Sequence, residues 1–431
     1  MERILELAKE VSEEAEVCVV TSEETPIQFE TNRLKHAQTR QSTTVGLRVI
    51  RAGRIGYATS TSLDDAENLV KMAVSTSEFG AKARFEFPSL AKYPRVRVLD
   101  GETSSVPLED MVKLGEQMIS ALLQDTPELQ CEAWISKGSS KLQIINTRGG
   151  HASYRQTHFS IGVTGTLIRG TDMLFVGRGE SSCHPILDVG GVIHMAKEQL
   201  DRSRNLASIG SGQFPVIFTP GGVASALVSP LVAAFNGKTV LEGASPVGNK
   251  LGDTICDPSF TLRDDPLLPF RPTSRPCDDE GVPSQTTPLI EEGVVRSFLY
   301  DLQTAAQAGK KSTGSAGRGR GLPSPSPSAF VIGPGKTSFD AMVCSIKEGL
   351  VIEDLMGAEQ GNILGGDFSG NVLLGFKIEN GRIVGRVKNT MVSGNIYQLL
   401  KSLTMGNDPR WENGFINTPS LLFPAVSVAS K

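Results

Sequence analysis

The chain has 431 residues and a mass of 46.1 kDa, two to three times the size of a usual domain, which predicts at least two domains. Its 43 basic and 47 acidic residues give a net charge of −4, so it lacks the basic excess that binding a phosphate backbone requires. Nucleic acid is therefore excluded as a first hypothesis. Apolar residues at 39% and charged residues at 21% are typical of a globular protein, and the 45 glycines predict many turns.

The cysteines and the start of the sequence predict a cytoplasmic protein. The six cysteines lie far apart and form no C-x-x-C pair, which indicates reduced, mostly buried thiols. The sequence begins with acidic residues where a signal peptide needs a basic and then an apolar region. The longest apolar stretch, residues 223–235, is too short for a membrane span and contains Pro230, so we expect no transmembrane segment. The cysteines are Cys18, Cys131, Cys183, Cys256, Cys277 and Cys344.

The first hundred residues predict a helix, a buried strand and an antiparallel meander. Apolar residues at helical spacing over 4–15 precede an apolar run at 17–20. From Thr25 to Thr61 apolar and polar residues alternate, with residues 51–54 as a hairpin turn. Asp64 or Asp65 is suited to cap a helix that runs to about Ser77.

A similar pattern returns after residue 100. A proline-containing loop over 79–106 precedes a predicted helix at about 108–123 and a second β region from about Gln130. Residues 36–41 are echoed by residues 151–156, and a glycine-containing strand and a similar turn follow each copy. This order predicts a duplicated helix-plus-hairpin unit, over residues 1–100 and 101–210, with chance matching of short windows as the alternative.

The second half is predicted to be mainly β. A helix at about 187–201 and a polar stretch at 203–213 place the domain boundary near residue 210. After it come a strand at 215–218 and a helix to Phe235 that Pro230 should kink. The predicted fold class is thus α+β, with an N-terminal α/β domain containing antiparallel sheets over 1–210 and a mainly β domain over 211–431. Residues 307–328, rich in Gly, Ser and Pro, are predicted to be a flexible loop.

Common catalytic motifs are absent from the sequence. All five histidines precede the boundary, so the second half lacks the usual general base and the commonest zinc ligand. Residues 333–337 imitate the end of a phosphate loop, but Phe330 stands where that motif needs glycine, and no G-x-S-x-G is present. His151 and His158 should face opposite sides of a strand, and the adjacent Cys183 and His184 should diverge.

Charged clusters are the remaining polar features. The clusters at 264–265 and 278–281 offer carboxylates for a hard cation or for the amino end of a peptide. Aspartates that form turns by accepting hydrogen bonds from nearby amides are the interpretation that spacing favours. The basic run at 317–321 is likewise predicted to be a solvated loop.

The order of several unusual segments in the second half resembles the TldD/PmbA family, also described as peptidase-like or as a "modulator of DNA gyrase". Residues 30–59 resemble the N-terminal region of that family, so the resemblance covers nearly the whole chain. The segments in the second half are 214–218, 221–225, 249–253, 278–283, 289–294, 312–314, 365–369 and 379–381.

The resemblance implies a cytoplasmic heterodimer of two related subunits that cleaves unfolded or modified peptides. In the TldD type, an H-E-x-x-x-H helix and a later cysteine hold the metal, which lowers the pKa of bound water. In this sequence the corresponding stretch, residues 228–233, contains no His, Glu or Cys, and no cysteine follows Cys344. The departure indicates the PmbA type, also called TldE, and Asp367-Phe368-Ser369 resembles a signature of that type. We therefore expect no metal ligands, no catalytic residues and no cofactor in this chain.

The predicted function is that of a non-catalytic subunit, which binds and guides peptide substrates for proteolysis by a zinc-bearing TldD-type partner. One alternative is a homodimeric peptide-binding or regulatory protein with no hydrolytic role, and another is an independent hydrolase that uses a metal at residues 278–280. A strand edge in the β half is suited to hold a peptide through main-chain hydrogen bonds. Neither nucleic acid nor membrane is a predicted partner. The predicted substrate-binding residues match family motifs and are polar; they are Asp278, Asp279, Glu280, Ser312, Thr313 and Gly314.

Overall fold

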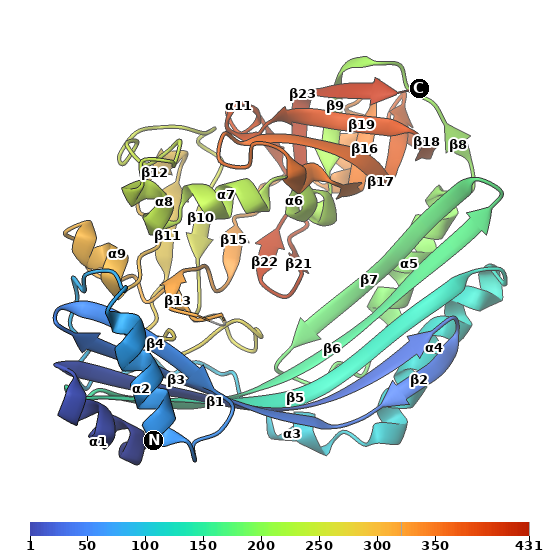
Figure 1. Ribbon diagram of the computed structural model, residues 1–431. Coiled ribbons are helices and arrows are strands. Elements are labelled where there is room, and N and C mark those ends of the chain that lie inside the picture. The colour runs from blue at the N-terminus through green and yellow to red at the C-terminus, as the bar shows by residue number, and fades with distance from the viewer. Residues whose placement is uncertain (320, 431) are drawn as a thin grey trace.

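A curved N-terminal sheet and a mainly β C-terminal half make up the molecule. The computed structural model describes residues 1–319 and 321–430. Figure 1 shows the sheet of the first half passing below and beside the second half, with the β21–β22 hairpin (Arg410–Glu412 and Ile416–Thr418) reaching back toward it. The mixture of helices with largely antiparallel sheets confirms the predicted α+β class.

The N-terminal sheet has seven strands, all paired antiparallel, in the order β4-β3-β1-β5-β6-β7, with β2 paired to β1. The two meanders meet where β1 pairs with β5, and β7 is the edge strand of the second. The strands are β1 (Glu14–Glu30), β2 (Arg33–Ala37), β3 (Arg40–Arg51), β4 (Arg54–Ser60), β5 (Gln130–Asn146), β6 (His151–Arg169) and β7 (Asp172–Ser182).

Both meanders follow one helix and precede another. The turn between β3 and β4 contains Ala52 and Gly53, whose φ values of 49° and 65° suit a tight hairpin, as predicted. Gly170, with φ of 63°, lies in the corresponding β6–β7 turn of the second meander. The predicted loop over 79–106 contains one short helix, which corrects that prediction. The helices are α1 (Glu2–Val11), α2 (Ala66–Ser77), α3 (Gly101–Ser105), α4 (Leu108–Asp125) and α5 (Gly190–Arg202).

Alternation along the strands decides where the helices pack. The helices α1 and α2 bury Ile4 and Leu69 in one core with Val17 and Leu47, residues of β1 and β3 that point to the same face. The helices α4 and α5 cover the strands of the second meander, where Ile135 and other β5–β7 residues form a core that continues into the C-terminal half. No helix in the described part of the chain is long and apolar enough to cross a membrane.

Over residues 211–319 and 321–430, the C-terminal half forms three sheets. The eight-stranded sheet has the order β16-β9-β23-β19-β17-β18-β8, with β20 paired to β23. Its strands are β8 (Leu206–Ala207), β9 (Gly212–Phe218), β16 (Glu348–Met356), β17 (Asp367–Glu379), β18 (Arg382–Val387), β19 (Thr390–Asn395), β20 (Thr404–Met405) and β23 (Leu421–Ser430). The six-stranded sheet has the order β12-β11-β10-β15-β22-β21 and includes β10 (Leu262–Asp264), β11 (Thr287–Glu291), β12 (Val294–Val295) and β15 (Phe330–Ile332).

The helix predicted to end at Phe235 is broken into two, α6 (Pro220–Ala226) and α7 (Val228–Ala234), and the break is at Leu227. In a continuous helix the ring of Pro230 would clash with the carbonyl of Ala226, four residues earlier, so the break has the predicted cause. The other helices of this half are α8 (Gly237–Leu241), α9 (Leu302–Gln307), α10 (Phe339–Cys344), α11 (Ile396–Leu399) and the 3-10 turn η1 (Ala358–Gln360).

The prediction of a flexible loop over 307–328, and of a solvated loop at 317–321, is wrong for much of this segment. β13 (Ala316–Gly317) pairs with β14 (Ser324–Pro325) in a short ribbon, and α9 ends at Gln307, the first residue of the segment. Ser315 and Ala316 are almost fully buried, and Arg318 is 9% exposed. The basic run at 317–321 does not form a solvated loop, because Arg318 pairs with the buried carboxylate of Glu16. Arg320, in the same run, lies outside the described residues.

Helix α4 approaches the sheet closely at Gly115, and replacing this glycine tests that packing. A Cβ atom there would lie 2.3 Å from Cε2 of Phe29 and 2.9 Å from Cδ1 of Ile135. We expect Gly115→Ala to lower the free energy of unfolding by about 1–3 kcal/mol, since overpacking outweighs the gain in helix propensity. The control is Gly101→Ala in α3, where a Cβ meets open space. Equal stability of the two variants in urea denaturation would contradict this packing.

Candidate functional site

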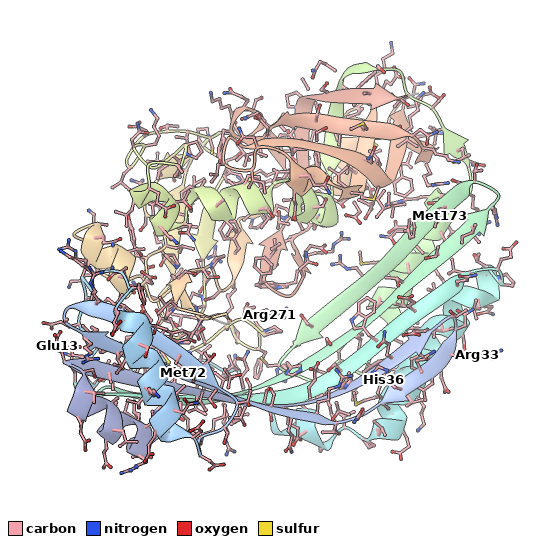
Figure 2. All side chains as sticks on the ribbon, viewed as in Figure 1. Glu13, Arg33, His36, Met72, Met173 and Arg271 are labelled. Carbon is pink, nitrogen blue, oxygen red and sulfur yellow. The ribbon has the colours of Figure 1, made fainter. Side chains whose placement is uncertain are left out.

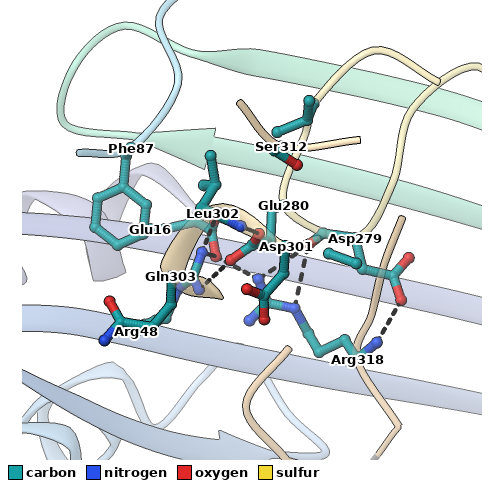
Figure 3. A network of polar contacts seen from close by, with 12 residues as sticks. Glu16, Arg48, Phe87, Asp279, Glu280, Asp301, Leu302, Gln303, Ser312 and Arg318 are labelled. Carbon is teal, nitrogen blue, oxygen red and sulfur yellow. Dashed lines mark hydrogen bonds and ion pairs between the residues drawn. The ribbon is translucent and has the colours of Figure 1, made fainter. Parts of the chain in front are cut away.

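Two loops of the C-terminal half that carry the predicted site residues meet the N-terminal sheet in a buried network of charges. Figure 3 shows Glu16 and Arg48 from the sheet facing Asp279, Glu280 and Arg318 from the other half. This network brings together residues that lie more than 200 positions apart in the sequence.

The sheet contributes a cross-strand pair of opposite charge. Glu16 of β1 lies directly opposite Arg48 of β3, and a guanidinium nitrogen of Arg48 is 3.2 Å from the carboxylate. The neighbours Val17 and Leu47 point to the other face, into the core with α1 and α2. Alternation therefore turns both charged side chains toward the C-terminal half, where they are almost fully buried.

Glu280 completes the pair from the other half. Its Oε1 is 2.5 Å from Nη1 of Arg48, and its Oε2 accepts a hydrogen bond of 2.7 Å from the backbone N–H of Leu302, at the start of α9. The rings of Phe85 and Phe87 each lie 4.9 Å from the Arg48 guanidinium. Burial raises the pKa of Glu280 to about 7, and the charge of Arg48 opposes this rise.

Arg318, which follows β13 in the β13–β14 ribbon, also contacts the acidic residues of this network. Its guanidinium contacts Glu16 directly and donates a 3.0 Å hydrogen bond to the backbone carbonyl of Asp279. Its backbone N–H donates to Oδ2 of Asp279 at 2.7 Å, and Arg275 lies 3.3 Å from the other oxygen. The charge of Glu16 raises the pKa of Arg318 against the effect of burial. Each charge in this group therefore has an opposite charge in contact.

Asp278 builds the turn that presents Glu280. Its Oδ1 accepts hydrogen bonds from the N–H groups of Glu280 at 3.0 Å and Val282 at 2.9 Å, and its Oδ2 accepts from Ala316 at 3.0 Å. Gly281 takes a φ of 73°, which favours glycine. Burial raises the pKa of Asp278 to about 6. The aspartate acts as the turn-forming residue that spacing favoured.

Residues 312–314 lie beside this turn and support the segment before α9. Thr313 Oγ1 accepts a 2.8 Å hydrogen bond from the N–H of Tyr300, while Ser312 Oγ donates to the Tyr300 carbonyl at 3.1 Å. Gly314 has a φ of 67°, and a Cβ there would lie 2.5 Å from the carbonyl oxygen of Pro283. The structure thus brings all six predicted residues together, with Asp278 and Glu280 fully buried. Their contacts are with the protein itself, and peptide binding by them stays a prediction.

Asp264, in the second acidic cluster, is a buried carboxyl group on β10. Its Oδ1 accepts from the N–H groups of Ser328 at 2.7 Å and Ala329 at 2.9 Å. Its Oδ2 has no hydrogen-bond partner among the described residues. Burial raises the pKa of Asp264 to about 7, and the two backbone hydrogen bonds and the charge of Arg275 oppose this rise only in part.

Helix α7 contains residues 228–233, the stretch that the resemblance equates with the TldD-type metal motif, and its side chains do not fit a metal ion. On α7, Val228, Pro230 and Leu231 are buried in an apolar core, and Ser229 Oγ donates to Glu359 at 2.8 Å. Over residues 1–319 and 321–430, no group of three or more His, Cys, Asp and Glu side chains has an arrangement suited to a metal ion. His184, which sequence spacing left without a partner, contacts Asp100.

A cleft of about 860 Å³ lies between the two halves, and sequence reasoning did not find it. One wall is the edge strand β7, and the other is the β21–β22 hairpin with Arg271 from a loop before β11. Figure 2 labels Arg271 on the side of the cleft where β7 ends, far from Met173 at the start of that strand. The only two tryptophans of the chain, Trp134 and Trp411, both line this cleft, which is the one signal that the sequence offered.

An ion pair fixes the hairpin against the strand. Arg178 of β7 donates to both carboxylate oxygens of Glu412, at 2.6 Å and 2.5 Å, and to the carbonyl of Trp411 at 2.9 Å. Both side chains are 10% exposed, so the pair is largely removed from water. The cleft therefore has rigid walls that come from both halves of the chain.

Comparison with known proteins agrees with this architecture. The model of the PmbA/TldA metallopeptidase C-terminal domain matches residues 211–430, and that of PmbA/TldA metallopeptidase domain 1 matches residues 15–77. The chain belongs to this family, usually written PmbA/TldD, as the sequence motifs indicated.

Relatives match the chain over nearly its whole length. An uncharacterized protein of Methanocaldococcus jannaschii is 28% identical over 433 residues, with 98% of each chain covered. Metalloprotease PmbA of Escherichia coli O157:H7 is 26% identical, with 99% of this chain and 94% of the relative covered. The crystal structure of TldE from Thermococcus kodakarensis superimposes with a TM-score of 0.90 at 23% identity over 100% of both chains, which shows the same fold.

Removing Arg48 tests whether the buried network holds the two halves together. We expect Arg48→Met to lower the free energy of unfolding by about 3–5 kcal/mol, because Glu280 then stays buried without its cation. The matched control is Arg204→Met, since Arg204 and Asp201 form an exposed pair at 2.6 Å whose loss should cost less than ~1 kcal/mol. Similar midpoints for both variants in guanidinium denaturation would show that the network contributes little.

The raised pKa of Asp264 predicts a pH dependence of stability with a definite sign. Between its ordinary value of 3.8 and about 7, the folded chain holds a proton on Asp264 that the unfolded chain has lost. This contribution to stability is therefore complete below pH 3.8 and is lost as the pH rises toward 7, with a slope of at most ~1.4 kcal/mol per pH unit.

Asp264→Asn should remove this slope, because the amide does not titrate. Denaturation from pH 5 to pH 8 measures it, with Asp253→Asn at an exposed aspartate as the control. Parallel stability curves for the protein and for Asp264→Asn would overturn the assignment.

Proposed function

We propose that the chain is a non-catalytic subunit of a cytoplasmic PmbA/TldD-type peptidase, which binds and guides peptides for a zinc-bearing TldD-type partner. The observation that carries the proposal is the lack of metal-ligating side chains on α7. Where the TldD type presents H-E-x-x-x-H, this helix presents Val228, Ser229 and Ala233, and it buries most of its side chains in the core. A helix packed in this way offers no first ligand for a metal.

The cleft supports the binding role. Its volume of about 860 Å³ lies in the range of ligand sites, and its walls combine an edge strand with aromatic and charged side chains. The carboxylates of the predicted polar cluster favour a structural role over an independent hydrolase, since Asp278 and Glu280 already accept hydrogen bonds or ion pairs from the protein.

The test is reconstitution with a TldD-type chain that carries H-E-x-x-x-H. The mixture is expected to hydrolyse an unfolded model peptide that neither chain cleaves alone, and size-exclusion chromatography should show a joint species. A partner with the Glu of the motif replaced by Gln serves as the control, and its mixture should associate without activity. Absence of association at micromolar concentration would contradict the proposal, and a stable homodimer of this chain alone would favour the regulatory alternative.

A further inference from the structure

The edge strand β7 presents unpaired backbone groups to the cleft. Gly177 pairs with Thr164 of β6, yet its N–H donates to Oε1 of Gln199 on α5 at 2.8 Å, away from β6. Since backbone groups alternate in direction along a strand, the N–H and C=O groups of Gly179 and Ser181 also point away from β6. Among the described residues these two amides have no hydrogen-bond acceptor outside the sheet. An extended chain fits such an edge by adding a strand.

The loop that carries Arg271 is held in a strained conformation. Phe270 has a φ of 56°, which is rare for a bulky residue. Its carbonyl accepts hydrogen bonds from the N–H of Cys183 at 3.0 Å and from Oγ of Ser182 at 3.2 Å. The end of β7 thus fixes this loop and sets the Arg271 guanidinium 4.8 Å from the ring of Trp411. Strain that neighbouring contacts maintain in this way is typical of binding sites.

Arg271 is the cleft arginine that has no carboxylate partner among the described residues. Glu412 is shared between Arg178 and Arg410, which lies 3.7 Å from it. Glu180 also lines the cleft and its charge acts on Arg271, but the two side chains do not form an ion pair, and Oε1 of Glu180 lies near the start of α5, 3.5 Å from where a Cβ of Gly191 would be. Within residues 1–319 and 321–430, no carboxylate lies within ion-pair distance of Arg271. Its planar guanidinium is suited to a carboxylate that comes from outside.

Trp134 gives the cleft an apolar floor. A Cβ at Gly162 would lie 2.0 Å from Cζ2 of Trp134, and one at Gly179 would lie 2.9 Å from the same atom. These two glycines let the indole lie flat across β6 and β7, and 38% of the residue stays exposed. An aromatic face in this position offers contact to an apolar side chain.

We propose that the cleft binds an extended peptide segment carrying a carboxylate. Its backbone pairs with the β7 edge at Gly179 and Ser181, an apolar side chain packs on Trp134, and the carboxylate forms an ion pair with Arg271. The inference rests on the proposed function and names the class of peptide that this subunit accepts. The carboxylate comes from the C-terminus of the peptide or from an acidic side chain, and the experiment separates the two.

Intrinsic fluorescence of the full chain is a direct readout, because both tryptophans line the cleft. A short tryptophan-free peptide is titrated in three forms: with a free C-terminus, with an amidated C-terminus, and amidated with one internal glutamate. At least one carboxylate form is expected to bind about 10-fold more tightly than the neutral amide. The form that binds identifies the source of the carboxylate. N-methylation of alternate peptide amides should weaken binding of every form, because it removes the donors for the strand edge.

Arg271→Gln is expected to remove the preference for the carboxylate forms and to leave the affinity of the neutral amide unchanged. The matched control is Arg296→Gln, since Arg296 pairs with Glu291 at 3.1 Å on the surface and lies outside the cleft. Thermal melting of each variant checks that it is folded.

Equal affinity of the carboxylate and amide forms for the unmodified protein would overturn the inference, as would unchanged carboxylate affinity in Arg271→Gln. Absence of peptide binding at millimolar concentration by calorimetry would do the same. The proposed function is tested separately. Peptide binding without partner-dependent hydrolysis would contradict the proposed function but support the binding site. Hydrolysis that depends neither on the peptide carboxylate nor on Arg271 would contradict only the binding site.

Discussion

The buried charges of Glu16, Arg48, Glu280 and Arg318 set the arrangement of the two halves. Taking a carboxylate or a guanidinium out of water is costly, and the cost is offset only when an opposite charge stands in contact with it. Glu16 and Arg48 are supplied by neighbouring strands of the sheet, whereas Glu280 and Arg318 come from loops of the other half. Arg48 contacts Glu280 and Arg318 contacts Glu16 across the boundary between the halves, so the network is complete only when the two halves meet in this register.

The cleft follows from that register. Its walls are the edge strand β7 and the β21–β22 hairpin, and neither could form a site alone. Two further ion pairs fix the distance between the halves: Arg178 with Glu412 beside the cleft, and Arg386 of β18 with Asp172 at the far end of β7, at 2.5 Å. A cleft held at both ends keeps its backbone edge, its aromatic faces and Arg271 in position, and for the proposed peptide this preorganisation would lower the entropic cost of binding.

The helix α7 separates this chain from the catalytic pattern of its family. The helix begins after a break, and Pro230 lies three residues after that break. This arrangement lets Val228 and Leu231 pack in the apolar core. A metal helix needs side chains that point into an accessible cavity, while α7 directs its side chains into a core. The proposal of binding without hydrolysis rests on this difference in side chains, since the chemistry of a site is set by its side chains and not by its fold.

The sequence determined the local structure and the family of this protein. Alternation predicted the meanders, residues 51–54 the tight turn, and Pro230 the helix break, because these depend on neighbouring residues and on sterics within a few positions. The order of short motifs likewise indicated the family. Which charged residues are buried and which of them form ion pairs was decided only by the tertiary structure. The sequence predicted Arg318 to lie in a solvated loop, whereas in the structure it is buried against Glu16, 302 positions away. Trp134, Arg271 and Trp411 line one cleft, although their spacing in the sequence does not indicate that they are neighbours. Burial and ion pairing depend on contacts between distant segments, and a one-dimensional pattern does not contain those contacts.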